Sequence, residues 1–252
     1  MNAFRRIRFG DPDPIHFSPT ELCKCPKSLL GKKEGVETIY APETLQIFED
    51  GSTIHLKEGI LRNGMKGLID MELHMTIIRD DESYIISGYS DFLMFDMIGM
   101  YIEDLKSCKF GAFWHFLKEK GSPSELLQVS IYAWLYWIIN KVRITKGVIT
   151  KISRENPRNQ ISLEIDLIPV EQITEFIEEH PTILFLQDKI TKTEFNNRTK
   201  QYVENNRWMC NYCDDLKCSI RTKLLKEDDK KCQQNLNSVS YTHLTLPTIL
   251  LV

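Results

Sequence analysis

Three charged residues stand in apolar stretches that should be buried, and their types suit phosphoryl-transfer chemistry. Asp91 ends the run "YIISGYSD", and Asp104 and Lys106 follow in "YIEDLK". Because side chains alternate across a strand, Asp104 and Lys106 should share one face. Two neighbouring carboxylates repel each other unless a hard cation such as Mg²⁺ or Mn²⁺ lies between them. Lys106 would then orient, or help to deprotonate, a metal-bound water aimed at a phosphodiester. Taken singly, each charge equally suits an ordinary salt bridge or a solvated sheet face.

Other polar residues stand at fixed spacings around this trio. Gln128 and Tyr132 lie one turn apart on a predicted buried helix, where a glutamine needs a partner. His55 ends the upstream element "GSTIH". In order, G-x-x-[hydrophobic]-H, G-x-x-D, D-x-K and Q-x-x-x-Y resemble the motifs of RecB-like nucleases in the PD-(D/E)XK superfamily. The resemblance implies metal contacts from His55, Asp91 and Asp104, and catalytic roles for Asp91, Asp104, Lys106, Gln128 and Tyr132.

Three cysteines near the C-terminus, Cys210, Cys213 and Cys218, form a C-x2-C-x4-C array. Such an array can hold a metal or cluster, with a fourth ligand from Cys23 or Cys25 in "ELCKCPK". One N-terminal cysteine before proline and three C-terminal ones resemble the iron-sulfur nucleases of the CRISPR-associated Cas-four family and the AddB nuclease domain. The resemblance favours Cys25 and implies a [4Fe-4S] cluster that joins both ends of the chain. A four-cysteine Zn²⁺ site is the alternative.

The resemblance implies a metal-dependent DNA exonuclease that acts on single-stranded ends. In the Cas-four family such enzymes work beside the CRISPR integrase proteins. A formal net charge of −3 gives no overall basic signal, so DNA contacts must be local. Two other functions stay open: a zinc-stapled recombination or repair nuclease, and a catalytically idle DNA-binding scaffold. The basic residues that could follow phosphates near the N-terminus are Arg5, Arg6, Lys24, Lys27, Lys32 and Lys33.

The elements that must position these residues alternate between helix and strand. A helix is predicted from the cap Ser18 and Pro19, and a second across residues 51–69. Strands are predicted at 71–79, 83–96 and 99–106. A buried helix follows, with a Ser122–Glu125 capping box, and then strands at 145–152 and 161–168 and a helix from about residue 170. This order predicts an α/β fold with a mixed central sheet flanked by helices, the restriction-endonuclease-like core of the superfamily.

The length of 252 residues suits one domain with appendages, which we place at residues 1–237. The last fifteen residues, 238–252, change abruptly to threonine, leucine and β-branched residues, and we expect a non-native or disordered tail there. No apolar run is long enough for a membrane span or a secretory signal. We therefore expect a cytoplasmic protein without membrane partners, in which cysteines serve as thiols or metal ligands.

Overall fold

The structure is a computed structural model that describes residues 15–36, 42–62, 67–79, 82–119, 121–206, 210, 218–219 and 222–223. The chain divides into two compact units, Met1–Thr199 and Lys200–Val252. The sheet and all residues of the predicted catalytic set belong to the first unit. The predicted tail, residues 238–252, lies outside the described residues.

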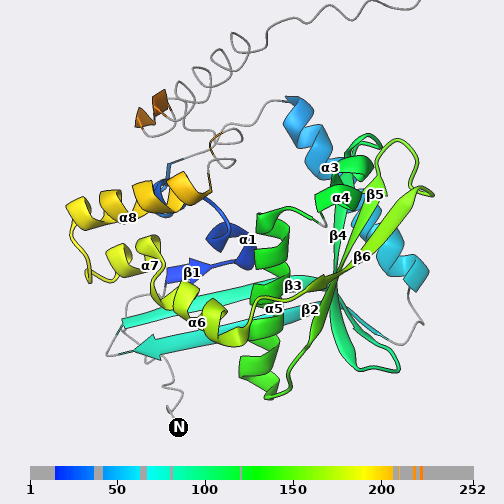
Figure 1. The fold of residues 1–252 in the computed structure, drawn as a ribbon, viewed down its shortest axis with the longest axis horizontal. Coiled ribbons are helices and arrows are strands. Elements are labelled where there is room, and N and C mark those ends of the chain that lie inside the picture. Colours follow the sequence, from blue (N-terminus) through cyan, green and yellow to red (C-terminus); the bar gives the residue numbers. More distant parts are fainter. Residues whose placement is uncertain are drawn as a thin grey trace, which may run out of the picture. The chain divides into compact units, whose positions relative to one another are not determined.

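Six described strands form one mixed sheet in the first unit (Figure 1). β1 pairs with β3 and β4 with β5 in parallel, and the other neighbours are antiparallel. Helices flank this sheet, so the predicted α/β class with a mixed sheet is confirmed. The strands are β1 (Ile15–Phe17), β2 (Gly67–Arg79), β3 (Glu82–Phe95), β4 (Met100–Cys108), β5 (Lys146–Ser153) and β6 (Gln160–Asp166).

The long strand β3 carries neighbours on both edges, and one edge is interrupted. β2 pairs with it from Glu82 to Met94. Because a strand has only two edges, β1 and β4 must share the other one. β1 pairs there with residues 84–86 and β4 with residues 92–95. Residues 87–91 of β3 therefore face a gap between β1 and β4, and Asp91 lies at the end of this gap next to β4.

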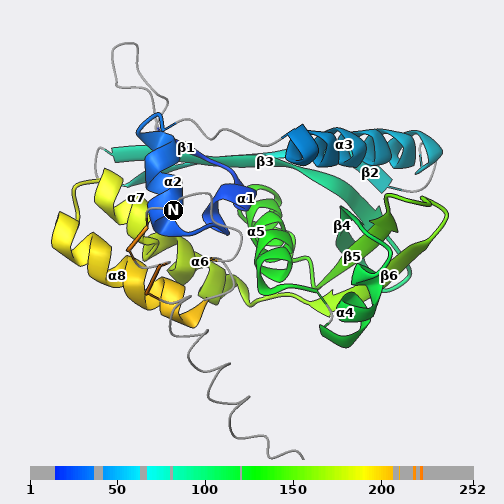
Figure 2. The same cartoon turned by 90° about the horizontal axis from the view of Figure 1, so that it is seen from above.

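Helix α5 (Pro123–Asn140) begins with the predicted capping box and is buried as predicted. The Ser122 hydroxyl accepts a hydrogen bond from the Glu125 amide at 3.3 Å, and the Glu125 carboxylate accepts one from the Ser122 amide at 2.8 Å. The stretch from Gln128 to Leu135 is buried throughout. Helix α3 (Pro42–Arg62) lies on the other side of β3 (Figure 2). The two helices thus enclose the sheet at the level of the predicted site.

Two apolar clusters fix which way the strand residues point. The larger one lies between the sheet and α5 and includes Leu93 and Ile102. The smaller one joins Ile54 of α3 to residues of three strands, Phe92, Leu105 and Ile152. Because Leu105 points into the smaller cluster, its neighbours in β4 must point towards α5.

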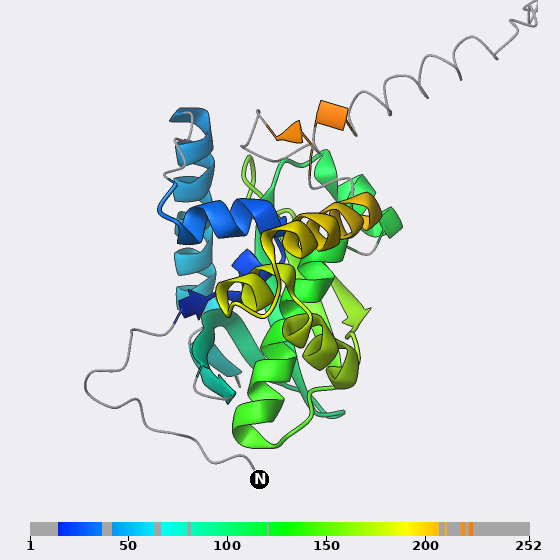
Figure 3. The same cartoon turned by 90° about the vertical axis from the view of Figure 1, so that its left-hand side faces the viewer.

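The remaining described helices surround the core. α2 packs against α7 (Figure 3). At this contact the Thr182 hydroxyl donates a hydrogen bond to the Pro26 carbonyl at 2.9 Å. None of the described helices is long and apolar enough to cross a membrane. The bounds are α1 (Pro19–Leu22), α2 (Pro26–Lys33), α4 (Ala112–Glu119), α6 (Val170–Glu178), α7 (Pro181–Leu186) and α8 (Lys192–Asn205).

The described elements differ from the sequence-based expectations in three places. The predicted helix 51–69 begins earlier, at Pro42, and ends at Arg62, because residues from Gly67 onward pair with β3. The N-terminal helix ends at Leu22, since Pro26 disfavours helical geometry at the preceding residue and starts a new helix instead. Helix α4 was not predicted at all.

Candidate active site

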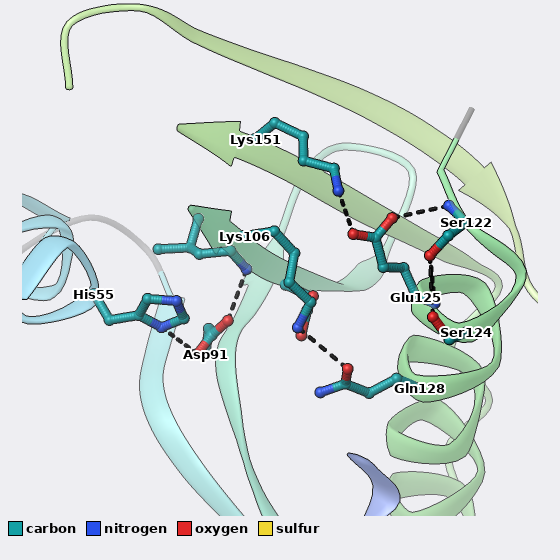
Figure 4. A network of polar contacts seen from close by, with 10 residues as sticks. His55, Asp91, Lys106, Ser122, Ser124, Glu125, Gln128 and Lys151 are labelled. Atoms are coloured by element: carbon teal, nitrogen blue, oxygen red, sulfur yellow. Dashed lines mark hydrogen bonds and ion pairs between the residues drawn. The ribbon is translucent and has the colours of Figure 1, made fainter. Parts of the chain in front are cut away.

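Asp91 lies where β3 and β4 separate. The pairing of these strands ends at Phe92 and Glu103. One oxygen of Asp91, Oδ2, then accepts a hydrogen bond from the Leu105 amide of β4 at 2.7 Å. Its other oxygen lies 3.0 Å from Nδ1 of His55 on α3 (Figure 4). The Asp91 carboxylate thus takes the place of a backbone acceptor for the Leu105 amide of β4. It also links β3 and β4 to α3.

The charge state of His55 follows from this contact. The hydrogen bond with Asp91 raises the pKa of His55, and this outweighs burial, which lowers it. About a third of the side chain, 36%, remains exposed to solvent. His55 therefore contacts the Asp91 carboxylate through a side chain that is partly exposed to solvent. This contact favours the protonated form of His55.

Asp104 is almost fully buried, with 2% of its surface exposed. Nζ of Lys106 lies 2.7 Å from its Oδ2, and the two groups form an ion pair. Burial raises the pKa of Asp104 to about 6; the Lys106 charge lowers it and the charges of Asp91 and Glu125 raise it. Asp104 is thus a buried carboxylate near other acidic groups, which favours the approach of a cation.

Lys106 connects this carboxylate to α5. Its ammonium donates a hydrogen bond to Oε1 of Gln128 at 3.2 Å (Figure 4). Burial would lower the pKa of Lys106, but the charges of Asp104, Asp91 and Glu125 raise it above the ordinary value. In this arrangement Lys106 is a charged donor. It can orient a water molecule, but it cannot accept a proton.

Gln128 and Tyr132 lie one behind the other on α5, as their spacing predicts. Tyr132 is hydrogen-bonded to Gln128, and burial raises the pKa of Tyr132 to about 12. Its ring packs against Gly88 of the G-x-x-D motif, where an added Cβ would lie 3.3 Å from the ring and 2.9 Å from Cδ of Pro19. Gly88 therefore lets α1 and α5 approach β3 closely, and Tyr132 supports Gln128 from the core.

The structure brings five predicted residues together in two contact groups, His55 with Asp91 and Asp104 with Lys106 and Gln128, and the charge of Asp91 acts on Asp104. Tyr132 lies directly behind Gln128. The two carboxylates offer the hard oxygen ligands that Mg²⁺ and Mn²⁺ prefer. His55 contacts Asp91 directly, and its role as a metal ligand remains a prediction. Among the described residues, no three His, Cys, Asp or Glu side chains form a ready metal-binding group. The donor chemistry thus fits a divalent cation held by two carboxylates. The five residues are His55, Asp91, Asp104, Lys106 and Gln128.

Sequence reasoning missed a second charge pair in the same place. Lys151 of β5 is in register with Lys106 of β4, and the Glu125 carboxylate forms an ion pair with it (Figure 4). The sequence identified Glu125 only as a helix cap. The position of Lys151 depends on the register of two parallel strands joined through α4 and α5, which residue types do not specify.

The cysteine prediction remains a prediction. Cys25 caps α2 directly before Pro26. Cys23 lies in the main core, where burial raises its pKa to about 12. Cys210 and Cys218 are buried and belong to the second unit, whereas Cys213 lies outside the described residues.

Two of the basic residues predicted to follow phosphates also form ion pairs within the fold. Lys32 and Lys33 contact the two carboxylate oxygens of Glu21 at 2.6 and 2.9 Å. Burial would raise the pKa of Glu21, but these hydrogen bonds lower it to about 2. Arg5 and Arg6 lie outside the described residues.

Comparisons with known proteins concern the fold. No protein-family model and no curated protein matches the sequence. The crystal structure of SSO0001 matches with a TM-score of 0.52 at 20% identity, over 86% of this chain and 90% of that one. An alkaline exonuclease from Laribacter hongkongensis matches with a TM-score of 0.45 at 10% identity, over 75% of this chain and 94% of that one. Its complex with dAMP matches with a TM-score of 0.45 at 9% identity, over 76% and 93%. The chain therefore shares its fold with SSO0001, and the weaker likeness to the exonuclease says nothing about chemistry.

Proposed function

We propose that the protein is a metal-dependent DNA exonuclease of the PD-(D/E)XK superfamily. The observation that carries this proposal is the buried Asp104, ion-paired with Lys106 at 2.7 Å beside the gap that ends at Asp91. A buried charged pair is expensive to desolvate, and replacing one by apolar residues is often neutral or stabilising. Charges kept there, with a second carboxylate and a histidine nearby, suit a catalytic role better than a structural one.

The residues divide the work of phosphodiester hydrolysis between them. Asp91 and Asp104 would hold Mg²⁺ or Mn²⁺, which supplies Lewis acidity towards the phosphate. Lys106 orients the water that attacks phosphorus, while the bond to the leaving oxygen breaks and the proton of the water passes to solvent. Gln128, fixed by Tyr132, holds the Lys106 ammonium in place. His55 holds Asp91 and covers the open side of the metal site.

The finer features of the proposal rest on the order of the motifs. We propose single-stranded DNA ends as substrate, and a [4Fe-4S] cluster on Cys25, Cys210, Cys213 and Cys218, with Zn²⁺ as the alternative metal at these cysteines. A role beside CRISPR integrase proteins is the pathway that the Cas-four resemblance favours. Anaerobic purification tests the cluster: brown protein with about four irons per chain supports it, and colourless protein with one zinc supports the alternative.

A nuclease assay tests the activity directly. Labelled single-stranded DNA with unblocked or blocked ends is incubated with protein and Mg²⁺ or Mn²⁺, and with EDTA as the metal-free control. The wild type should degrade unblocked strands only, and Asp104→Asn should lose about a thousandfold of this rate because the charged metal ligand becomes a neutral amide.

Glu103→Gln is the matched control, because this buried carboxylate is the adjacent residue of β4 and points to the opposite face. It should keep the activity. DNA binding without any cleavage by the wild type would favour the idle scaffold, and equal activity of Asp104→Asn and wild type would refute the assigned site.

A further inference from the structure

Lys151 on β5 is the register partner of Lys106 on the neighbouring strand β4. The two residues are register partners in the parallel strands β4 and β5, so their side chains leave the sheet on the same face. Adjacent strands lie about 4.8 Å apart, which places the two lysine stems side by side. Both side chains are largely withdrawn from solvent, with 27% of Lys106 and 14% of Lys151 exposed. A lysine therefore stands beside the proposed catalytic one without contacting its carboxylates.

Glu125 holds Lys151 in a fixed position. One oxygen of this carboxylate pairs with the Lys151 ammonium, and the other accepts the Ser122 amide in the capping box. The Lys151 ammonium also lies 5.3 Å from the centre of the Phe116 ring. An ammonium has three N–H donors, and the pair with Glu125 occupies one of them. The remaining donor capacity lies on the face of the sheet where Lys106 meets Asp104.

The same strand offers a matched lysine on its opposite face. Lys146 pairs with Asp96 at 2.7 Å and lies 5.0 Å from the centre of the Tyr101 ring. Lys146 and Lys151 thus have the same kinds of partner, a carboxylate and an aromatic ring. They differ in what lies next to them. Lys146 lines a groove under α3, and Lys151 adjoins Lys106.

From this placement we infer that Lys151 contacts a phosphate of the DNA strand next to the one that is cleaved, and that Glu125 is its positioning residue. The inference rests on the proposed function and deepens it, because it assigns the side of the site along which the strand runs. Two lysines on neighbouring strands would then face consecutive phosphates, one beside the metal and one beyond it.

Salt dependence of DNA binding separates this role from a structural one. Binding of labelled single-stranded DNA is measured over a range of KCl concentrations, in the Asp104→Asn background so that the strand stays intact. Each lost phosphate contact should reduce the slope of log K against log salt by about 0.7. We expect this reduction for Lys151→Gln, together with roughly tenfold weaker binding. Lys146→Gln should keep the original slope, and Lys151→Arg should restore it.

A double variant accounts for the carboxylate left behind. If Lys151→Gln weakened binding only because Glu125 became an uncompensated negative charge, Glu125→Gln/Lys151→Gln would restore the original affinity and slope, and the inference would be overturned. A slope still shallower by about 0.7 in the double variant supports a phosphate contact. A lower melting temperature with an unchanged slope marks Lys151 as a structural lysine and also overturns the inference.

The proposed function and the inference fail in different ways. Wild-type protein that cleaves no DNA with Mg²⁺ or Mn²⁺ overturns both. Wild-type protein that cleaves DNA, with an unchanged salt slope in Lys151→Gln, leaves the nuclease intact and overturns only the role of Lys151.

Discussion

The two faces of β4 and β5 carry similar residues in different settings. On the α3 face, Glu103, Lys146 and Asp96 line a groove of about 700 Å³ together with Glu164. Here the Glu103 carboxylate accepts the Thr150 hydroxyl at 2.6 Å, and Lys146 pairs with two largely solvated carboxylates. On the α5 face, Asp104 forms an ion pair with the Lys106 ammonium and lies near two further carboxylates, Asp91 and Glu125.

The difference is between a buried carboxylate that already has a hydrogen-bond donor within the fold, Glu103, and one that is suited to bind a cation, Asp104. A buried carboxylate that already accepts a hydrogen bond from a hydroxyl group is stabilised little by a bound cation. A buried carboxylate whose pKa is raised by burial and by other acids gains much, because a cation removes both penalties. The two faces therefore predict different responses to the same kind of substitution.

Replacing the lysines on the two faces should give the largest contrast. Lys106→Met should reduce the turnover of single-stranded DNA by about 10² to 10³, the range found when a positioned charged or hydrogen-bonding donor is removed from an active site. Lys146→Met removes the same charge from the groove face and should change turnover less than twofold. Steady-state rates with Mn²⁺ measure both, and equal losses in the two variants would erase the distinction between the faces.

Removing the amide that holds Lys106 should have the next largest effect. Gln128→Leu deletes the acceptor of a charged hydrogen bond, which is worth about 1.5 to 3 kcal/mol, so turnover should fall about 10- to 100-fold with little change in KM. Ser130→Ala on the same helix is the control. It removes a hydroxyl that accepts the Ile168 amide, so it should lower the melting temperature and leave turnover as it was.

The raised pKa of Asp104 predicts a pH dependence of metal binding. With a pKa of about 6, the carboxylate is mostly protonated at pH 5 and mostly charged at pH 7. Because a proton competes with the cation, apparent Mn²⁺ affinity should rise about tenfold over this interval. Titration calorimetry measures it. In Lys106→Met the rise should move to higher pH, since the charge that lowers the pKa is gone; a rise centred near pH 4 in the wild type would contradict the burial of Asp104.

The smallest effect on activity is expected on the groove face. Thr150→Val leaves Glu103 without its hydroxyl donor and should lower the free energy of unfolding by about 1 to 3 kcal/mol. Nuclease activity at a temperature well below the melting point should be unchanged. Urea denaturation and the single-stranded DNA assay give the two values, and a parallel loss of both would mean that the groove also serves the site.

Local patterns predicted most of the elements, and they proposed the site residues, whose roles remain predictions. The capping box of α5, the burial of Gln128 and the strands around Asp91 and Asp104 follow from caps and alternation, which act over a few residues. The helix predicted at residues 51–69 ran too far because short apolar stretches suit a helix and a strand equally well. Pairing with β3 decides between them, and a partner distant in sequence is not visible locally.

The contacts that complete the site depend on such distant partners. The interrupted edge of β3 arises because β1 and β4 share it, and the neighbourhood of Lys106 and Lys151 arises from the register of β4 and β5. Likewise, nothing in "GSTIH" specifies that His55 would meet Asp91 through Nδ1. Tertiary packing sets these relations, so the sequence supplied the residue types and the fold supplied their geometry.

Because Asp91 accepts a hydrogen bond from the Leu105 amide, replacing Asp91 would affect both the proposed catalysis and the local structure. Asp91→Ala would remove a proposed metal ligand, and it would also leave the Leu105 amide without its hydrogen-bond acceptor. Asparagine removes the negative charge but still offers an oxygen to the amide. Asp91→Asn should therefore disturb the junction of β3 and β4 less than Asp91→Ala, although both variants lose the carboxylate proposed to bind the metal.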